Sequence, residues 1–222
     1  MLAQAPHELA TLLTLADSRL PTGGHVHSGG IEEAITTGRV SDLGSLRAYL
    51  CRRIRTQGLV SASLAVAVHS GDLSVELADA ETDARTPSPA ARAASRAQGR
   101  GLLRLAKRVW PEPVAGPVPG WAGLGVKPHL PVVAGVVGST SGIATEHTAL
   151  SMVYTTMTGS ATAAQRLLAL DPADVAAMTF ELSPLCAQTA AQALDGPAEL
   201  SDPLLDVLAE QHATRERPLF SS

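Results

Sequence analysis

Residues 59–68 read Leu-Val-Ser-Ala-Ser-Leu-Ala-Val-Ala-Val, and this stretch decides the fold. Its apolar residues cover every face of a helix apart from two serines, whereas a surface helix carries a single apolar stripe. A helix of this kind is covered on all sides by other elements. Strand-type alternation of apolar and polar residues is scarce in the rest of the chain. We therefore predict an all-α, single-domain bundle built around residues 59–68.

Helical patterns continue on both sides of this stretch and predict roughly nine or ten short helices. Ser41 or Asp42 caps one helix, and Asp171 before a proline opens another, because these residue types are favoured at helix starts. Prolines and glycines crowd residues 111–128, which we expect to form a flexible loop, and residues 196–222 are expected to be a frayed tail. The other predicted helices cover 7–16, 28–38, 72–83, 87–109, 132–137, 145–157 and 160–170, and the helix opened by Asp171 ends near 194.

The composition of the 222 residues limits the classes of function. Charged residues make up 17% of the chain, against about 25% in an average soluble domain. We therefore expect part of the surface to be covered by other proteins. A net charge of −4 and an aromatic content of 3% argue against nucleic-acid binding, which needs basic patches and stacking rings.

Cysteine usage and hydropathy indicate a cytoplasmic protein. Cys51 and Cys186 form no CxxC pair, lie in apolar helical patterns and are expected to be buried hydrophobic residues. The first residues lack the basic and apolar segments of a signal peptide. Two uncharged stretches, 128–145 and 147–165, are interrupted by glycine, serine and threonine, so neither predicts a membrane span.

Motifs of common enzyme classes are absent from the sequence. Neither Lys107 nor Lys127 follows a glycine, so the chain has no phosphate-binding P-loop. Residues 138–142 miss the nucleophile-elbow pattern GxSxG because threonine takes the central position. The zinc motif HExxH does not occur either. The residues therefore suggest no catalytic constellation.

The most unusual segment is 15–32, where two glycine pairs stand beside Asp17, His25, His27 and Ser28. Glycine pairs permit positive φ and a close approach of the backbone to other groups. Three interpretations remain open: a packed helix–loop–helix joint, a divalent-metal site formed by the two histidines, and a hydrolytic triad of Ser28, His27 and Asp17.

A row of five arginines, spaced four residues apart, lies on the helix predicted over 87–109. Such a row winds slowly along one side of the helix. It indicates either a solvated face or a docking surface for an acidic partner, because arginine is favoured at protein interfaces. His129 and His147 flank glycine- and valine-rich helices and are expected to be core or interface histidines. The arginines are Arg92, Arg96, Arg100, Arg104 and Arg108.

Three segments of the chain, taken in order, resemble the UreF family of urease accessory proteins. The first follows the pattern Asp-Ser-x-x-Pro-x-Gly-Gly-aromatic-x-His-Ser-x-Gly-hydrophobic-Glu, except that His25 replaces the aromatic residue. Residues 93–103 resemble the family's Ala-Ser-x-x-x-Gly-Arg-x-Leu-Leu helix, and residues 128–135 its His-x-Pro-Val-x-x-Gly segment. The family's later Pro-Leu-Gly-Gln turn is replaced here by residues 169–172. The matching residues of the first pattern are Asp17, Ser18, Pro21, Gly23, Gly24, His27, Ser28, Gly30, Ile31 and Glu32.

This resemblance implies an all-α homodimer with neither enzymatic activity nor a cofactor of its own. The partners that it implies are a UreD/UreH-type accessory protein, a UreG-type GTPase and apo-urease, with no nucleic acid and no membrane. The chain would bridge these proteins and modulate GTP-dependent nickel delivery to apo-urease. The alternative is a nickel carrier that binds the ion through His25 and His27, with His129 or His147 as a further ligand.

The same match suggests which residues form the partner-binding surface. The glycine-rich segment and Glu32 are expected to shape this surface, and Arg100 to stabilise the segment or the partner. Two further residues fall where the family has its penultimate helices. The expected set is Gly23, Gly24, His27, Ser28, Glu32, Arg100, Tyr154 and Arg166.

Overall fold

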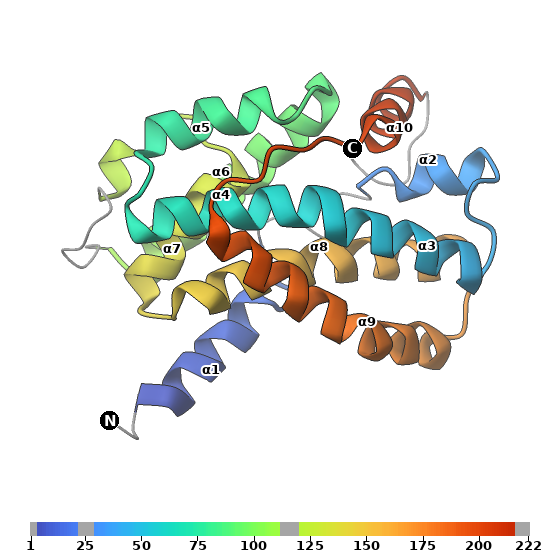
Figure 1. The fold of residues 1–222 in the computed structure, drawn as a ribbon, viewed down its shortest axis with the longest axis horizontal. Coiled ribbons are helices and arrows are strands. Elements are labelled where there is room, and N and C mark those ends of the chain that lie inside the picture. Colours follow the sequence, from blue (N-terminus) through green and yellow to red (C-terminus); the bar gives the residue numbers. More distant parts are fainter. Residues whose placement is uncertain (1–3, 22–28, 112–119, 216–222) are drawn as a thin grey trace.

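The computed structural model describes residues 4–21, 29–111 and 120–215, which contain helices and turns but no β-strand. The predicted all-α fold is thereby confirmed. Figure 1 shows the helices gathered in an elongated bundle, with the N-terminal helix projecting from its lower edge. The α-helices are α1 (Gln4–Leu15), α2 (Ile31–Thr36), α3 (Leu43–Arg53), α4 (Leu59–Ser70), α5 (Val75–Ala84), α6 (Pro89–Val109), α7 (Leu130–Ser141), α8 (Thr145–Leu167), α9 (Pro172–Gln192) and α10 (Pro203–Ala213).

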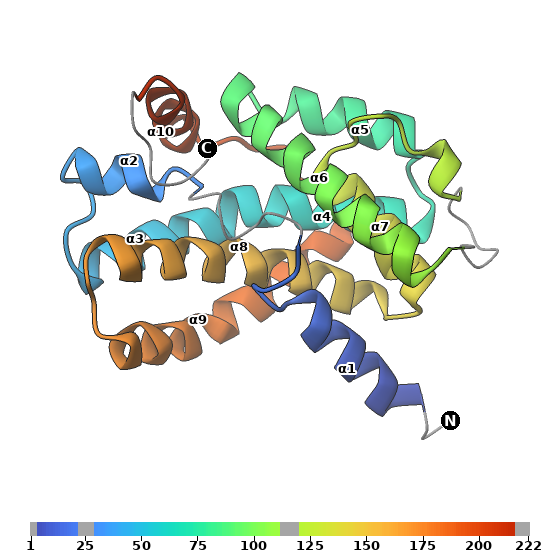
Figure 2. The same ribbon diagram turned by 180° about the vertical axis from the view of Figure 1, so that it is seen from behind.

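Helix α4 lies at the centre of the bundle, as its all-apolar sequence predicts. It packs against α5, α7, α8 and α9 and lies among other helices in both views (Figures 1 and 2). Every residue from Ala62 to Val68 is buried. The hydroxyl of Ser63 donates to the carbonyl of Val60 at 3.0 Å and accepts from the amide of Ala198 at 2.9 Å. The polar group in this core helix is therefore hydrogen-bonded, which removes the cost of burying it.

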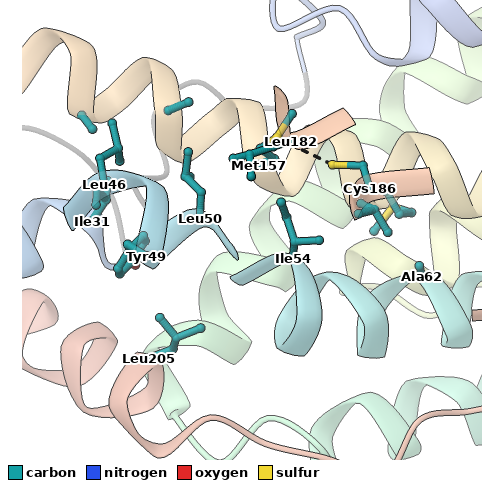
Figure 3. Packing of buried hydrophobic residues seen from close by; sticks show 14 of the residues in the cluster. Ile31, Leu46, Tyr49, Leu50, Ile54, Ala62, Met157, Leu182, Cys186 and Leu205 are labelled. Atoms are coloured by element: carbon teal, nitrogen blue, oxygen red, sulfur yellow. Dashed lines mark hydrogen bonds between the residues drawn. The ribbon is translucent and has the colours of Figure 1, made fainter. Parts of the chain in front are cut away.

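Two clusters of buried apolar side chains form the core on either side of α4. The larger one joins α2, α3, α8, α9 and α10, and Figure 3 shows its centre. There the Sγ atom of Cys186 lies 3.6 Å from the sulfur of Met157. Burial raises the pKa of the Cys186 thiol to about 11, so this cysteine is a neutral core residue, as predicted. The second cluster joins α5, α6 and α7 with Trp121 and Leu124.

Side-chain caps begin the helices where the sequence predicts them. The carboxylate of Asp42 accepts from the amide of Ser45 at 2.8 Å, and the Ser45 hydroxyl accepts in turn from the Asp42 amide, which completes a capping box. The carboxylate of Asp171 accepts from the amide of Ala173 at 2.8 Å, with proline at the first position of α9. These bonds satisfy amide groups that have no partner within the helix.

Several predicted boundaries differ in the structure. The helix expected over 28–38 begins only at Ile31, because Gly29 and Gly30 have φ values of 63° and 86°. The helices predicted over 145–157 and 160–170 are a single helix, α8, since a glycine at position 159 neither crowds a neighbour nor breaks the hydrogen-bonding ladder. Helix α3 continues into α4 through the π-helical turn η2 (Ile54–Gly58). No described helix is both long and apolar enough to cross a membrane.

The described parts of the predicted loop and tail pack against the bundle. Residues 112–119 of the loop lie outside the described residues, but Trp121 further along is buried and donates from Nε1 to the carbonyl of Trp110 at 2.7 Å. Within the tail predicted to fray over 196–222, residues 203–213 instead form α10, which buries Leu205 and Leu208 in the larger cluster. Apolar burial therefore holds this segment, and only residues 216–222 lie outside the description.

Candidate partner-binding site

A glycine turn with left-handed φ values opens helix α2 at the end of the signature segment. The hydroxyl of Tyr49 donates to the carbonyl of Gly29 at 2.7 Å, and Nη1 of Arg53 donates to the same oxygen. A Cβ atom on Gly29 would overlap the Arg53 guanidinium, and the left-handed φ would strain any other residue. Burial raises the pKa of Tyr49 despite the neighbouring guanidinium, which keeps the phenol a neutral donor. The turn is therefore held in one conformation by two buried side chains of α3.

Polar contacts join α10 and the residues that follow it to α2. Nε2 of His212 lies 2.7 Å from a carboxylate oxygen of Glu32, and both side chains are buried. Beside them, Nη1 of Arg215 donates to Glu33 at 3.1 Å and to the hydroxyl of Thr36 at 2.6 Å. Glu32, expected at the partner surface, therefore acts inside the chain, where it fixes the position of α10.

The other end of α10 is tied to α3 by Asp202. Nη2 of Arg52 donates to Oδ1 of Asp202 at 2.6 Å, and that oxygen also accepts from the amides of Leu204 and Leu205. Burial would raise the pKa of Asp202, but the bond and charge of Arg52 and the two amides together hold it below its ordinary value. The carboxylate is thus ionised and caps the helix in a single arrangement.

A cavity of 310 Å³ opens beside this turn and gathers several signature residues. Asp17, Ser18, Gly30 and Arg166 all contribute to its lining. Helix α8 presents hydroxyl groups and Gly159 to it, and α3 contributes Arg53, which is 7% exposed. The Nε atom of Arg53 has no hydrogen-bond partner among the described residues. The lining therefore brings several hydrogen-bonding groups together with apolar side chains.

The predicted residues of the signature loop, Gly23, Gly24, His25, His27 and Ser28, lie outside the described residues. The His-x-His metal site and the hydrolytic triad therefore stay untested. Asp17, the third member of that triad, is engaged by Arg19 at 2.6 Å, and this bond lowers the pKa of Asp17 to about 2.

The remaining predicted residues do not form one cluster. Arg100 lies exposed on α6, and its side chain makes no hydrogen bond or ion pair with any described residue. Tyr154 and Arg166 are separated along α8. Tyr154 is 37% exposed, and its side chain is not part of the cavity lining. Of the four predicted residues that the structure describes, only Arg166 borders the cavity.

The arginine row on α6 divides into two parts. Arg92 donates to the carbonyl of Thr86 at 2.8 Å, and Arg96 pairs with Asp79 at 2.9 Å and with Asp83 at 2.7 Å. These two arginines therefore hold α6 against α5 and the segment that joins the two helices. The C-terminal part of the row, which consists of Arg100, Arg104 and Arg108, is exposed.

The structure also brings together a polar cluster around His129, which is a core histidine, as the sequence predicts; the carboxylates that it meets were not predicted. Nε2 of His129, a fully buried residue, lies 2.8 Å from Asp83, and its Nδ1 lies 3.0 Å from the Ser95 hydroxyl. Ligand atoms of Asp79, Asp83 and His129 lie within 4.8 Å of one another, a spacing that a metal ion could bridge. Arg96, however, already binds both carboxylates, and both ring nitrogens of His129 are engaged. The arrangement therefore fits a structural network that joins α5, α6 and α7.

This network predicts a pH dependence of stability. Burial lowers the pKa of His129, although its hydrogen bond to Asp83 opposes this effect. The unfolded chain then binds a proton more readily than the folded chain, so the free energy of unfolding falls as the pH drops below about 6.5. Urea unfolding between about pH 5 and pH 8 should show this decline. The free energy of unfolding should change less steeply with pH in the variant His129→Gln. The same pH dependence in both proteins would contradict the role given to His129.

Together, the described residues define an all-α protein whose distinctive sequence segment lies at a turn, a helix junction and a cavity. Comparison with known proteins identifies the family. The chain belongs to the UreF family, whose model matches residues 40–183. A urease accessory protein UreF from Mycolicibacterium vanbaalenii is 71% identical over 217 residues, which cover 96% of this chain and 99% of that protein. Proteins of the same name from Mycobacterium marinum and Mycobacterium tuberculosis are 68% and 66% identical over 214 residues, which cover 96% of this chain and 99% of each relative.

Proposed function

We propose that this chain is a urease accessory protein that acts as an adaptor during maturation of the enzyme. It would bridge a UreD/UreH-type accessory protein and a UreG-type GTPase on apo-urease, and it would modulate GTP-dependent delivery of nickel. In this role the chain catalyses no reaction of its own and holds no resident cofactor, since nickel is the cargo of the whole complex. The family membership supports the place of the chain in urease maturation.

The rigid junction at the end of the signature segment supports the adaptor role. Tyr49 and Arg53 hold the glycine turn, and Asp202 and His212 hold the two ends of α10 beside it. A surface that is preorganised in this way loses little conformational entropy when a partner binds. Two copies of the chain would present two such junctions, which suits a partner that is itself two-fold symmetric.

Urease activation in a reconstituted system tests this function. Urease subunits and the other accessory proteins would be produced in a host with or without this chain, and urease activity and bound nickel would be measured. We expect activity and nickel content to fall more than about tenfold without the chain, at unchanged amounts of urease protein. Full activity in its absence would refute the proposal.

A matched pair of variants tests the role of the junction. Arg53→Met removes the buried donor to Gly29, whereas Arg55→Met removes an exposed arginine two residues away. We expect activation to fall only in the first variant, with a helical circular dichroism spectrum retained in both. Co-purification with the other accessory proteins, followed by mass measurement of the complex, would show whether the loss reflects failed assembly.

A further inference from the structure

The C-terminal half of helix α6 carries an exposed concentration of positive charge. The helix holds six of the 17 lysines and arginines of the chain and no acidic residue. Arg92 and Arg96 bind groups in and beside α5. The other four basic residues are exposed, and their side chains make no hydrogen bond or ion pair with any described residue. We call these four residues the cationic strip, which consists of Arg100, Arg104, Lys107 and Arg108.

The cationic strip occupies one face of α6. With a rotation of about 100° per residue, its four members lie within about 100° around the helix axis and about 12 Å along it. The opposite side of the helix buries Leu102, Leu103 and Ala106 in the second apolar cluster. Figure 2 shows α6 running across the front of α7, on the outside of the bundle. The strip therefore faces away from the core and is accessible to another molecule.

The arrangement of these charges costs the isolated chain stability. Arg104 lies four residues from Arg100 and from Arg108, and like charges at this spacing destabilise a helix. The negative end of the helix dipole favours cations only within the last turn. That turn holds Lys107 and Arg108, whereas Arg100 and Arg104 precede it. The described residues of the chain therefore do not offset the repulsion at Arg100 and Arg104, but a negatively charged partner would.

We infer that the cationic strip binds an acidic helix of a partner protein, one whose carboxylates repeat every three or four residues. Arginines four positions apart on α6 are separated by about 6 Å along the axis, and carboxylates four positions apart on a facing helix have the same separation. Each guanidinium can donate two parallel hydrogen bonds to one carboxylate. This inference rests on the proposed function, in which the chain joins several proteins, and it assigns a surface to one of those contacts.

Carboxylates of a protein suit the strip better than the phosphates of a nucleic acid or a membrane. The net charge of −4 repels an extended polyanion at long range, and four cations on one short strip neutralise few phosphates. A helix that binds a membrane surface exposes a broad apolar face beside its cations. Of the large apolar residues of α6, only Val109 is exposed. A short acidic helix requires neither a long basic track nor an apolar face.

Direct binding of the full-length chain to three purified probes tests the inference: the UreD/UreH-type protein, the UreG-type GTPase and apo-urease. We expect the double variant Arg100→Gln/Arg104→Gln to bind one of the three at least about tenfold more weakly. The affinity of the unchanged protein for that probe should fall more steeply with salt than the affinity of the variant. The double variant Arg39→Gln/Arg55→Gln, which changes two exposed arginines outside α6, is the matched control and should bind like the unchanged protein.

Urea unfolding of the isolated chain supplies a second readout. Glutamine forms helices about as well as arginine does, so relief of the repulsion should raise the urea midpoint of Arg100→Gln/Arg104→Gln. A lowered midpoint would overturn the inference.

The outcomes separate this inference from the proposed function. Equal binding of the strip variant and the unchanged protein to all three probes would overturn the inference alone, whereas an unchanged protein that binds none of them would overturn the proposed function as well. Strip-dependent binding to single-stranded RNA, or to vesicles of phosphatidylserine and phosphatidylcholine, in place of the three proteins would also overturn the inference.

Discussion

An alanine in place of Gly135 is expected to lower the free energy of unfolding by about 2 kcal/mol, because this glycine lets α7 approach the central helix α4. A Cβ atom at position 135 would lie 2.5 Å from the carbonyl oxygen of Ala65 and 2.7 Å from the Cβ of Val68. Both atoms belong to rigid parts of a buried helix, so the two helices would have to separate. The gain of about 1 kcal/mol in helix propensity does not offset this strain. Urea unfolding followed by circular dichroism measures the difference.

Gly159 supplies a control with the same substitution in the same kind of element. It lies within α8, and beyond the backbone of its own helix turn a Cβ atom there would meet nothing within 4 Å. Alanine at position 159 should therefore raise the free energy of unfolding by up to about 1 kcal/mol. Opposite signs for the two variants would demonstrate the close approach of α4 and α7. If both alanine variants were more stable than the unchanged protein, the close approach of α4 and α7 would be contradicted.

The same glycines explain how far the sequence could predict this part of the fold. The apolar stretch at 59–68 identifies the central helix, since only burial on all sides suits such a surface. Glycine, however, is a poor helix former, and a sequence rich in it predicts a short or broken helix. Helix α7 runs from Leu130 to Ser141 because close packing against α4 outweighs this weak local preference.

The sequence after residue 196 contains the start signal of a helix. Asp202 and Pro203 form the same cap-and-proline start that correctly predicts α9 at Asp171. The expected fraying rested instead on the nearby prolines. The burial of Leu205 and Leu208 depends on α10 docking onto helices more than a hundred positions earlier in the chain. No local pattern can predict such a long-range contact.

The candidate site, too, has features that the local sequence predicts and features that depend on how distant helices pack. The i, i+4 spacing of Asp79 and Asp83 places both carboxylates on one face of α5 and could be recognised in the sequence. Their bonds to Arg96 and His129 depend on how three helices pack, and the pairing of Glu32 with His212 spans 180 positions. Family resemblance identifies the segment that matters. It does not distinguish Glu32, which acts inside the chain, from a residue that contacts a partner.

Loss of the Asp202 carboxylate should release α10 from the bundle, and we expect Asp202→Ala to lower the free energy of unfolding by about 2 to 3 kcal/mol. A lost N-cap accounts for about 1 kcal/mol, and the lost hydrogen bond to Arg52 for a further 1.5 kcal/mol or more. Asp202→Asn separates the two contributions, because asparagine caps a helix as well as aspartate does but carries no charge. We expect Asp202→Asn to lower the free energy of unfolding about half as much as Asp202→Ala does, as measured by urea unfolding at pH 7.

The pH dependence of the Asp202 variants identifies the ion pair as the cause. The pKa of Asp202 is lowered in the folded chain, so the stability that its charge contributes is complete above the unfolded value of about 3.9. This contribution is lost as the pH falls through the lowered folded pKa. The difference in the free energy of unfolding between the unchanged protein and Asp202→Asn should therefore become smaller below about pH 4. A difference that stays constant down to about pH 2.5 would show that the bond to Arg52 contributes nothing, and that the cap alone holds α10 in place.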